Sequence, residues 1–171
     1  AGSLTFLGAF FIVVLSPLFA WLWPWLEKRG RNPSKPAKMA FGLMVAGLSF
    51  IPLMMAADIS ATGVMASVWW LVLAYFILEV AEMCLSPIGL SMVTKLAPVR
   101  LVGLGMGGWF LSTGIGNNLS GIFASHVSGE TGMTVASALD GYNFGLLSLL
   151  GGGILLVLLA PVIQKLMHGV K

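Results

Sequence analysis

Residues 69–98 read WWLVLAYFILEVAEMCLSPIGLSMVTKLAP. A helix of about 20 apolar residues can cross the hydrocarbon core of a bilayer, and this stretch is longer than that and mostly apolar. Its interior nevertheless contains two glutamates, Glu79 and Glu82, and one proline, Pro87. The stretch therefore predicts a membrane-spanning helix with a polar centre, and the fold and the function both depend on what that centre faces.

The composition of the whole chain also predicts a membrane protein. Of its 171 residues, 58% are hydrophobic and only 9% are charged, which is outside the range of ordinary soluble domains. A soluble all-α core is the alternative, but helices of soluble proteins carry a polar face, and most of these segments have none. We therefore expect an all-α membrane protein.

Five segments are expected to cross the bilayer, and they cover residues 4–26, 39–57, 68–97, 101–125 and 144–165. The connections between them are short and polar or rich in glycine and serine, and none has room for a soluble domain. We therefore expect one unit, residues 1–171, that is built from about five transmembrane helices.

The basic residues predict the orientation of these helices. All nine are found in the first and third connections and at the C-terminus, as Lys28, Arg29, Arg31, Lys35, Lys38, Lys95, Arg100, Lys165 and Lys171. The positive-inside rule places these regions in the cytoplasm, so we expect a cytoplasmic C-terminus and a cell membrane of the bacterial inner-membrane type. The basic residues form no continuous patch, so we expect no nucleic-acid partner.

A polar stripe runs along the helix of residues 69–98. With a rotation of 100° per residue, the side chains of Glu79, Glu82 and Ser86 lie within about 60° of one another. A carboxylate near the bilayer centre costs on the order of 2.5 to 3.5 kcal/mol on insertion scales, so this face is not expected to contact lipid. It is expected to contact protein, water or a ligand.

Three arrangements would make such a stripe tolerable in the membrane. A cation could come from a segment outside this chain, the stripe could line an aqueous cavity, or desolvation could keep a carboxyl group protonated and neutral. All three are typical of transporters. The structural alternative is a protonated glutamate that is hydrogen-bonded to a neighbouring helix, and it applies to Glu79 more than to Glu82.

Two further features favour a cavity in this region. Pro87 cannot donate a hydrogen bond to the carbonyl of Met83, so it predicts a kinked or broken helix, although such kinks also serve packing. In the following segment one face carries a large aromatic residue and then small or polar ones, namely Trp109, Thr113, Gly116 and Ser120. Trp109 and Phe110 are therefore candidates for the wall of a substrate pocket, although aromatic residues within helices more often pack.

Catalysis and metal binding have no support in the sequence. His126 and His168 lie at opposite helix edges and not at the spacing of metal ligands. No pair of a nucleophile and a base is recognisable. We therefore expect no enzyme activity, no cofactor and no metal site.

The run EMCLSPIGLSMVTKLAP, residues 82–98, resembles the tenth-helix signature of the proton-dependent oligopeptide transporter family, a branch of the major facilitator superfamily. Residues 16–50 (SPLFAWLWPWLEKRGRNPSKPAKMAFGLMVAGLSF) resemble its eighth helix, inner loop and ninth helix. Residues 105–121 (GMGGWFLSTGIGNNLSG) resemble its eleventh helix. The resemblance covers nearly the whole chain.

The resemblance implies a role for four residues and leaves one without a role. Glu82 matches the glutamate that receives the N-terminal ammonium of a peptide, and Ser86 matches a serine beside it. Trp109 and Phe110 match aromatic residues that line the side-chain pockets. Glu79 has no known counterpart, which leaves open whether Glu79 or Glu82 is the proton site.

The resemblance also implies a larger molecule. Members of the family have twelve core helices, so we expect this chain to be part of the C-terminal six-helix bundle and the N-terminal half to be its partner. Gly8 occupies the position at which the family usually has an Asn. The implied function is proton-coupled symport of di- and tripeptides, with peptide, protons and the lipid bilayer as partners.

Two other functions remain open. The family also includes carriers of nitrate and other small solutes, and an anionic substrate would be repelled by an ionised Glu82. A membrane assembly subunit that does not transport would use the acidic residues only to join helices.

Overall fold

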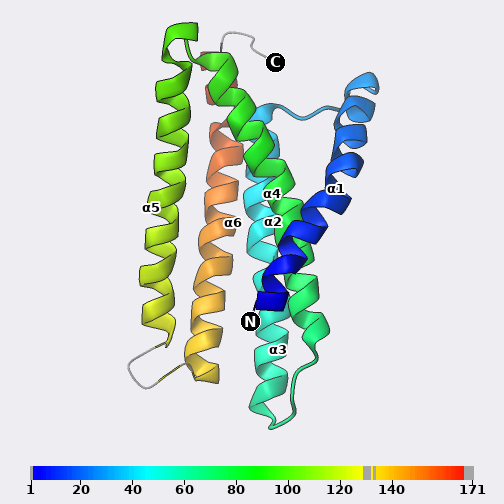
Figure 1. Cartoon of the computed structure of the whole chain (residues 1–171), viewed down its shortest axis with the longest axis vertical. Helices are drawn as coiled ribbons and strands as arrows, with labels where there is room; N and C mark the ends of the chain where they lie inside the picture. Colours follow the sequence, from blue (N-terminus) through cyan, green and yellow to red (C-terminus); the bar gives the residue numbers. More distant parts are fainter. Residues whose placement is uncertain (1, 129–131, 133, 168–171) are drawn as a thin grey trace.

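The computed structural model describes residues 2–128, 132 and 134–167, without the side chains of residues 2–5, 126 and 127. The regular elements among these residues are all helical: α1 (Gly2–Lys28), α2 (Lys35–Leu48), α3 (Phe50–Ala61), α4 (Val68–Leu96), the short 3-10 helix η1 (Val99–Leu101), α5 (Val102–Ser128) and α6 (Val135–Leu166). The long helices run side by side along one axis (Figure 1). The predicted all-α architecture is confirmed.

Within the described residues, four stretches are long and apolar enough to cross a membrane: Phe6–Lys28, Lys35–Ala61, Val68–Leu96 and Val135–Leu166. The fifth predicted segment lies in α5, which has 27 residues and is therefore long enough as well. Its stretch LSTGIGNNLSG, residues 111–121, contains eight glycine, serine, threonine and asparagine residues, which lower the hydropathy of α5. In Figure 1, α5 nevertheless extends along the same axis beside α6.

The second predicted segment is not one continuous helix, because it divides at Ser49 into α2 and α3. Pro52 has no N–H to donate to the carbonyl of Leu48, so the regular ladder cannot continue across this point. The backbone tightens there, and the N–H and the hydroxyl of Ser49 both donate to the carbonyl of Ala46, at 3.2 and 2.6 Å. Together α2 and α3 still form one membrane-length stretch.

The last helix begins nine residues before the predicted start at residue 144. Thr134 is its N-cap: the Thr134 hydroxyl accepts from the backbone N–H of Ser137, and the Ser137 hydroxyl accepts from that of Thr134, at 3.1 and 3.0 Å. This reciprocal capping box satisfies two N–H groups that a helix start leaves open. Of the residues discussed in the sequence, His168, Lys171 and the side chain of His126 lie outside the described residues.

The helix α4 is central to the packing, because it contacts α1, α2, α3 and α5, whereas α2 packs most extensively on α6. Small side chains fill these contacts: Ala40, Ala46, Ala74, Ala81 and Cys84 are all buried. A Cβ added to Gly42 would lie only 3.0 Å from the carbonyl oxygen of Ala81, so α2 and α4 approach closely there. Close approach through small residues is how helices pack where lipid provides no hydrophobic driving force.

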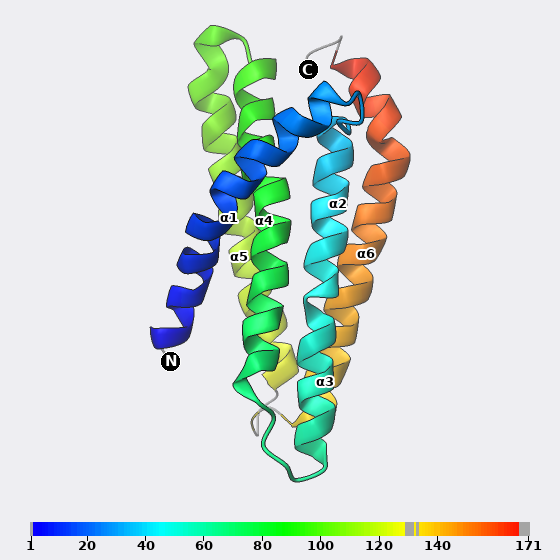
Figure 2. The same cartoon turned by 90° about the vertical axis from the view of Figure 1, so that its right-hand side faces the viewer.

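The helix α1 is attached differently from the others: along the described part of the chain its backbone approaches α4, and near its end Trp23 contacts Lys38 of α2. It has two internal prolines, Pro17 and Pro24, and Figure 2 shows it bending across the side of the bundle. A helix-interior proline removes a backbone hydrogen bond and commonly causes such a bend.

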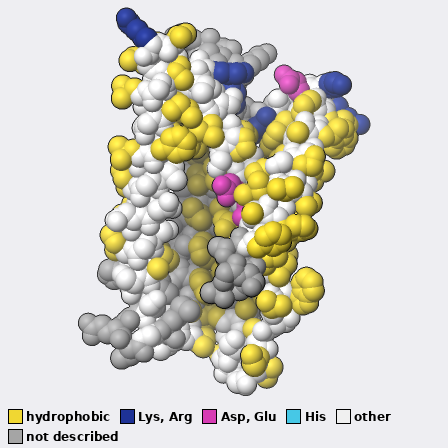
Figure 3. Space-filling model, viewed as in Figure 1, with side chains coloured by type: hydrophobic (Ala, Val, Ile, Leu, Met, Phe, Trp, Pro, Cys, Tyr) yellow, Lys and Arg dark blue, Asp and Glu magenta, His cyan; other side chains and the backbone are white. Residues whose placement is uncertain are grey.

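The described Lys and Arg side chains belong to one end of the bundle, where α1, α4 and α6 end and α2 and α5 begin; we call it the basic end. Its residues are Lys28, Arg29, Arg31, Lys35, Lys38, Lys95, Arg100 and Lys165. Figure 3 shows the dark blue side chains gathered there. Two of them lie over tryptophan rings, with Arg29 Cζ 3.9 Å from the centroid of Trp25 and Lys38 Nζ 4.1 Å from that of Trp23.

Candidate functional site

The two glutamates of α4 lie in different surroundings although they share one face of the helix. Glu79 is buried, with only 6% of its surface exposed, and it faces α1. A Cβ added to Gly8 of α1 would lie 2.7 Å from Oε1 of Glu79. A side chain at position 8 would therefore require this carboxyl group to move. The Oε2 atom of Glu79 has no hydrogen-bond partner among the described residues.

Glu82, one turn further along α4, is exposed. Its Oε1 atom accepts a hydrogen bond of 3.5 Å from the hydroxyl of Ser86, which lies on the next turn. In Figure 3, acidic side chains lie about half-way along the molecule, at the margin of a hollow between α1 and α5. The predicted polar stripe is therefore present, but one carboxyl group is enclosed between two helices and the other is open.

Pro87 does not interrupt the helix. The sequence predicted a kinked or broken helix at this point. The helix is not broken, because α4 continues as one α-helix from Val68 to Leu96, and the kink stays a prediction. A proline removes one backbone hydrogen bond, which is a small loss compared with the many backbone hydrogen bonds that remain on both sides of it. In addition, α4 is held by packing against α1, α2, α3 and α5. No unwound mid-membrane segment forms there.

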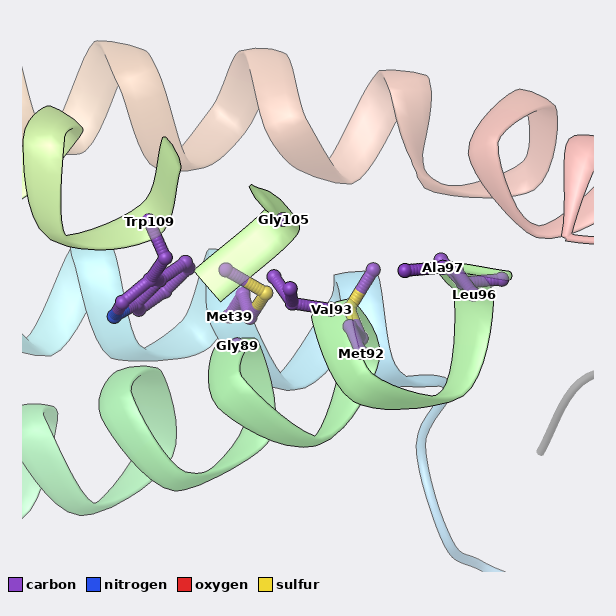
Figure 4. Close-up of a pocket in the computed structure, with 8 residues that line it drawn as sticks. All are labelled: Met39, Gly89, Met92, Val93, Leu96, Ala97, Gly105 and Trp109. Atoms are coloured by element: carbon purple, nitrogen blue, oxygen red, sulfur yellow. The ribbon is translucent and has the colours of Figure 1, made fainter. Parts of the chain in front are cut away.

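Trp109 of α5 packs on Gly89 of α4, because a Cβ added to Gly89 would overlap the indole ring. Beside this contact lies a mostly apolar cavity of about 440 Å³ that is shared by α2, α4 and α5 (Figure 4). Trp109 is at one end of it and Leu96 and Ala97 are at the other. Gly89 follows Glu82 by seven residues, or roughly 10 Å along the helix, so this cavity lies on the side of Glu82 towards the basic end.

The remaining predicted residues of α5 do not line the cavity beside Trp109. Phe110 is 62% exposed and does not line the cavity beside Trp109. The Thr113 hydroxyl donates to the carbonyl of Trp109, at 3.1 Å, within its own helix. The structure thus places Glu82 beside Ser86, and Trp109 beside Gly89, on one face of α4.

The contact between Gly89 and Trp109 provides a test of this packing. Gly89→Ala in the full-length protein should force the indole ring to move, and overpacking of this kind typically costs about 1 to 3 kcal/mol. Thermal unfolding in detergent measures the effect. Gly107→Ala is the matched control, since a Cβ on Gly107 meets nothing within 4 Å. Equal losses in the two variants would contradict this packing.

The chemistry available in this region is that of carboxyl groups and hydroxyls. Among the described residues, no three His, Cys, Asp or Glu side chains come together as a metal site would require. An open carboxylate such as Glu82 can bind a cation or an ammonium group, and an enclosed one such as Glu79 can take up a proton.

Two features of the site were not identified from the sequence. The first is that Glu79 packs against Gly8. The only signal for this contact was that Gly8 replaces the expected Asn. The contact of Trp109 with Gly89 is the other. No residue pattern indicated this contact, because the relative register of two helices is set by packing and not by either helix alone.

Comparison with known proteins gives these residues a context. The model of the POT family (PTR2) matches residues 1–138. The chain is 40% identical over 164 residues to the uncharacterized transporter YclF of Bacillus subtilis, covering 96% of this chain and 32% of that protein. It is 33% identical over 167 residues to a di-/tripeptide transporter of Lactococcus lactis, again covering 96% and 32%.

A solved structure extends the similarity to three dimensions. The crystal structure of peptide transporter POT in complex with sulfate superposes with a TM-score of 0.83 at 37% identity, covering 95% of this chain and 31% of that one. This chain thus spans about a third of the length of these relatives. The family resemblance found in the sequence is confirmed, and the chain belongs to the POT family of transporters.

Proposed function

We propose that this chain is part of the C-terminal bundle of a proton-coupled symporter that carries di- and tripeptides inward. The observation that carries the proposal is the position of Glu82, whose exposed carboxyl group lies beside the Ser86 hydroxyl in the middle of a membrane-length helix. The described basic side chains belong to the far end of the bundle. A carboxylate in this setting is complementary to the ammonium group of a ligand.

The residues have distinct roles in this proposal. Glu82 binds the N-terminal ammonium of the peptide, and Ser86 orients the carboxylate through its hydrogen bond. Trp109 and Phe110 contact substrate side chains, and Glu79 is the proton site. The names of relatives such as the di-/tripeptide transporter of Lactococcus lactis support a peptide as the substrate.

The placement in the cell also belongs to the proposal. The basic end lies in the cytoplasm and the C-terminus with it, by the positive-inside rule, in a membrane of the bacterial inner-membrane type. The N-terminal half of the transporter covers the open face on which Glu82 lies, and substrate binds between the two halves.

Two observations argue against the other candidate functions. An acid that only joins helices would be expected to have a hydrogen-bond partner on the neighbouring helix, whereas Glu79 Oε2 has none among the described residues. A nitrate carrier would require an anion to approach the open Glu82 carboxylate, which would repel it.

Uptake into proteoliposomes that contain the full-length protein tests the function. With an inward proton gradient, labelled dialanine should accumulate. Excess unlabelled dipeptide should abolish the signal, and excess nitrate should leave it unchanged. Competition by nitrate but not by dipeptides would replace the proposal with the anion carrier, and no gradient-driven uptake of either would favour the assembly subunit.

A further inference from the structure

A second cavity lies at the basic end, separate from the glutamates. It has a volume of about 510 Å³ and is enclosed by the end of α1, the start of α2 and the ends of α4 and α6. Lys35 and Lys38 of α2 and Lys95 of α4 all line it. We call this cavity the basic pocket.

Lys38 is the most unusual residue of the basic pocket. Only 8% of its surface is exposed, although lysine is almost never buried to this degree without a partner. Its ammonium group lies 4.1 Å from the centroid of the Trp23 ring and is attracted by the carboxylate of Glu27. A cation–π contact and one carboxylate in Coulombic range stabilise the charge but leave the pocket strongly positive.

Two further positively charged side chains lie close to each other in the basic pocket. Lys35 and Lys95 are close enough for their side chains to interact, and each raises the positive potential at the other. The ammonium group of Lys35 also donates to the hydroxyl of Ser91, at 3.5 Å. Three lysines and one glutamate among the described lining residues give the pocket a formal charge of +2.

The helix α2 adds to this positive potential. Lys35 is its first residue and Lys38 lies in its first turn, after the N-cap Ser34. Cations are disfavoured there, because the macrodipole places about half a positive charge at the N-terminus of a helix. The first turn of α2 contains no acidic residue to offset this charge.

The orientation of the protein in the membrane does not by itself account for the basic pocket. The positive-inside rule explains why basic residues lie at this end, and the macrodipole explains Lys95, which is in the last turn of α4. Neither requires that lysines from two helices converge on one cavity, or that Lys38 be buried at a helix N-terminus. An anion in the pocket would stabilise both features.

We propose that the basic pocket binds a phosphate group. Lysine ammonium groups are strong point-charge donors for phosphate, and the pocket lies at the level where lipid headgroups meet helix ends. Basic pockets between transmembrane helices on the cytoplasmic side are suited to anionic headgroups. The volume of the pocket accommodates a headgroup as well as free phosphate, so both are sources of the same chemistry. This proposal does not depend on the transported substrate.

The experiment compares two double variants of the full-length protein with the wild type. Lys35→Gln/Lys95→Gln removes two charges from the pocket and leaves the buried Lys38 in place. Lys28→Gln/Arg100→Gln removes two charges from the same end, but neither residue lines the pocket. Thermal unfolding is followed while phosphatidylglycerol is titrated against a phosphatidylcholine background, and separately while inorganic phosphate is titrated.

The pocket variant should bind phosphatidylglycerol, inorganic phosphate or both at least about tenfold more weakly than the wild type, while the control variant keeps most of its affinity. A loss confined to the phosphatidylglycerol titration identifies a lipid headgroup as the occupant, and a loss confined to inorganic phosphate identifies the free anion. Equal weakening in both double variants would show only general surface attraction and overturn the proposal. Failure of both probes to stabilise the wild type would also overturn it.

Discussion

Glu82→Gln in the full-length protein should reduce peptide accumulation to the background of empty vesicles. Glutamine keeps the shape of the side chain and can still accept a hydrogen bond from Ser86, but it loses the charge that attracts an ammonium group. Truncating one partner of a desolvated, hydrogen-bonded charge pair costs about 2 to 5 kcal/mol, which corresponds to a roughly 30-fold or greater loss of affinity. Binding of dialanine, measured by calorimetry, and uptake into proteoliposomes should fall together.

Glu27→Gln is the matched control for this experiment. Glu27 is also an exposed glutamate, but it lies at the basic end, in the last turns of α1. It should keep dipeptide affinity near the wild-type value. Wild-type binding and uptake by Glu82→Gln would remove Glu82 as the ammonium site and leave the proposed recognition without its central residue.

Glu79→Gln should abolish uptake that is driven by a proton gradient while it preserves exchange of peptide across the membrane at equal pH. The reason is that the Glu79 carboxyl group is enclosed against Gly8 whereas Glu82 is open, so we expect Glu79 to bind a proton without contacting the peptide. Counterflow of labelled dialanine measures the exchange, and accumulation under a gradient measures the coupling. Loss of both activities would make Glu79 part of peptide binding instead.

The thermal stability of variants at Glu79 provides a second, independent test of its role. A buried polar atom without a partner costs about 1 to 3 kcal/mol, so Glu79→Leu should leave the protein at least as resistant to heat as the wild type, although coupling is lost. Gly8→Ala keeps the carboxyl group but forces the flexible end of the Glu79 side chain to move, so we expect it to alter coupling more than stability. Marked destabilisation of Glu79→Leu would indicate a structural acid and contradict a proton site retained for function.

The helices were predictable from the sequence because hydropathy and segment length act within one helix. Two helix boundaries differ from the prediction, and both differences come from short-range chemistry that hydropathy does not detect. Pro52 and Ser49 divide α2 from α3. The reciprocal hydrogen bonds of Thr134 and Ser137 start α6 earlier than predicted. The cap was visible in principle, since Thr134 and Ser137 have the spacing of a capping box. It was obscured by the glycine- and serine-rich stretch before it.

The candidate site was predictable only in part. Helical periodicity placed Glu79, Glu82 and Ser86 on one face, and the structure has Glu82 beside Ser86 as that spacing requires. Periodicity could not say that Glu79 is enclosed and Glu82 open, because that difference depends on where α1 crosses α4. It also placed Trp109 on the polar face of α5, but it could not give the register between α4 and α5 that brings Trp109 to Gly89.

The packing of α2 on α6 determines how the bundle can assemble as the chain is synthesised. The helix α2 ends at Leu48 and α6 ends at Leu166, so its main partner is complete 118 residues later. At 5 to 20 residues per second, this is an interval of roughly 6 to 24 s. During it, α2 and α3 can pack against α4, whereas the face of each that α6 covers stays open. That face of α2 is therefore enclosed only when α6 is inserted.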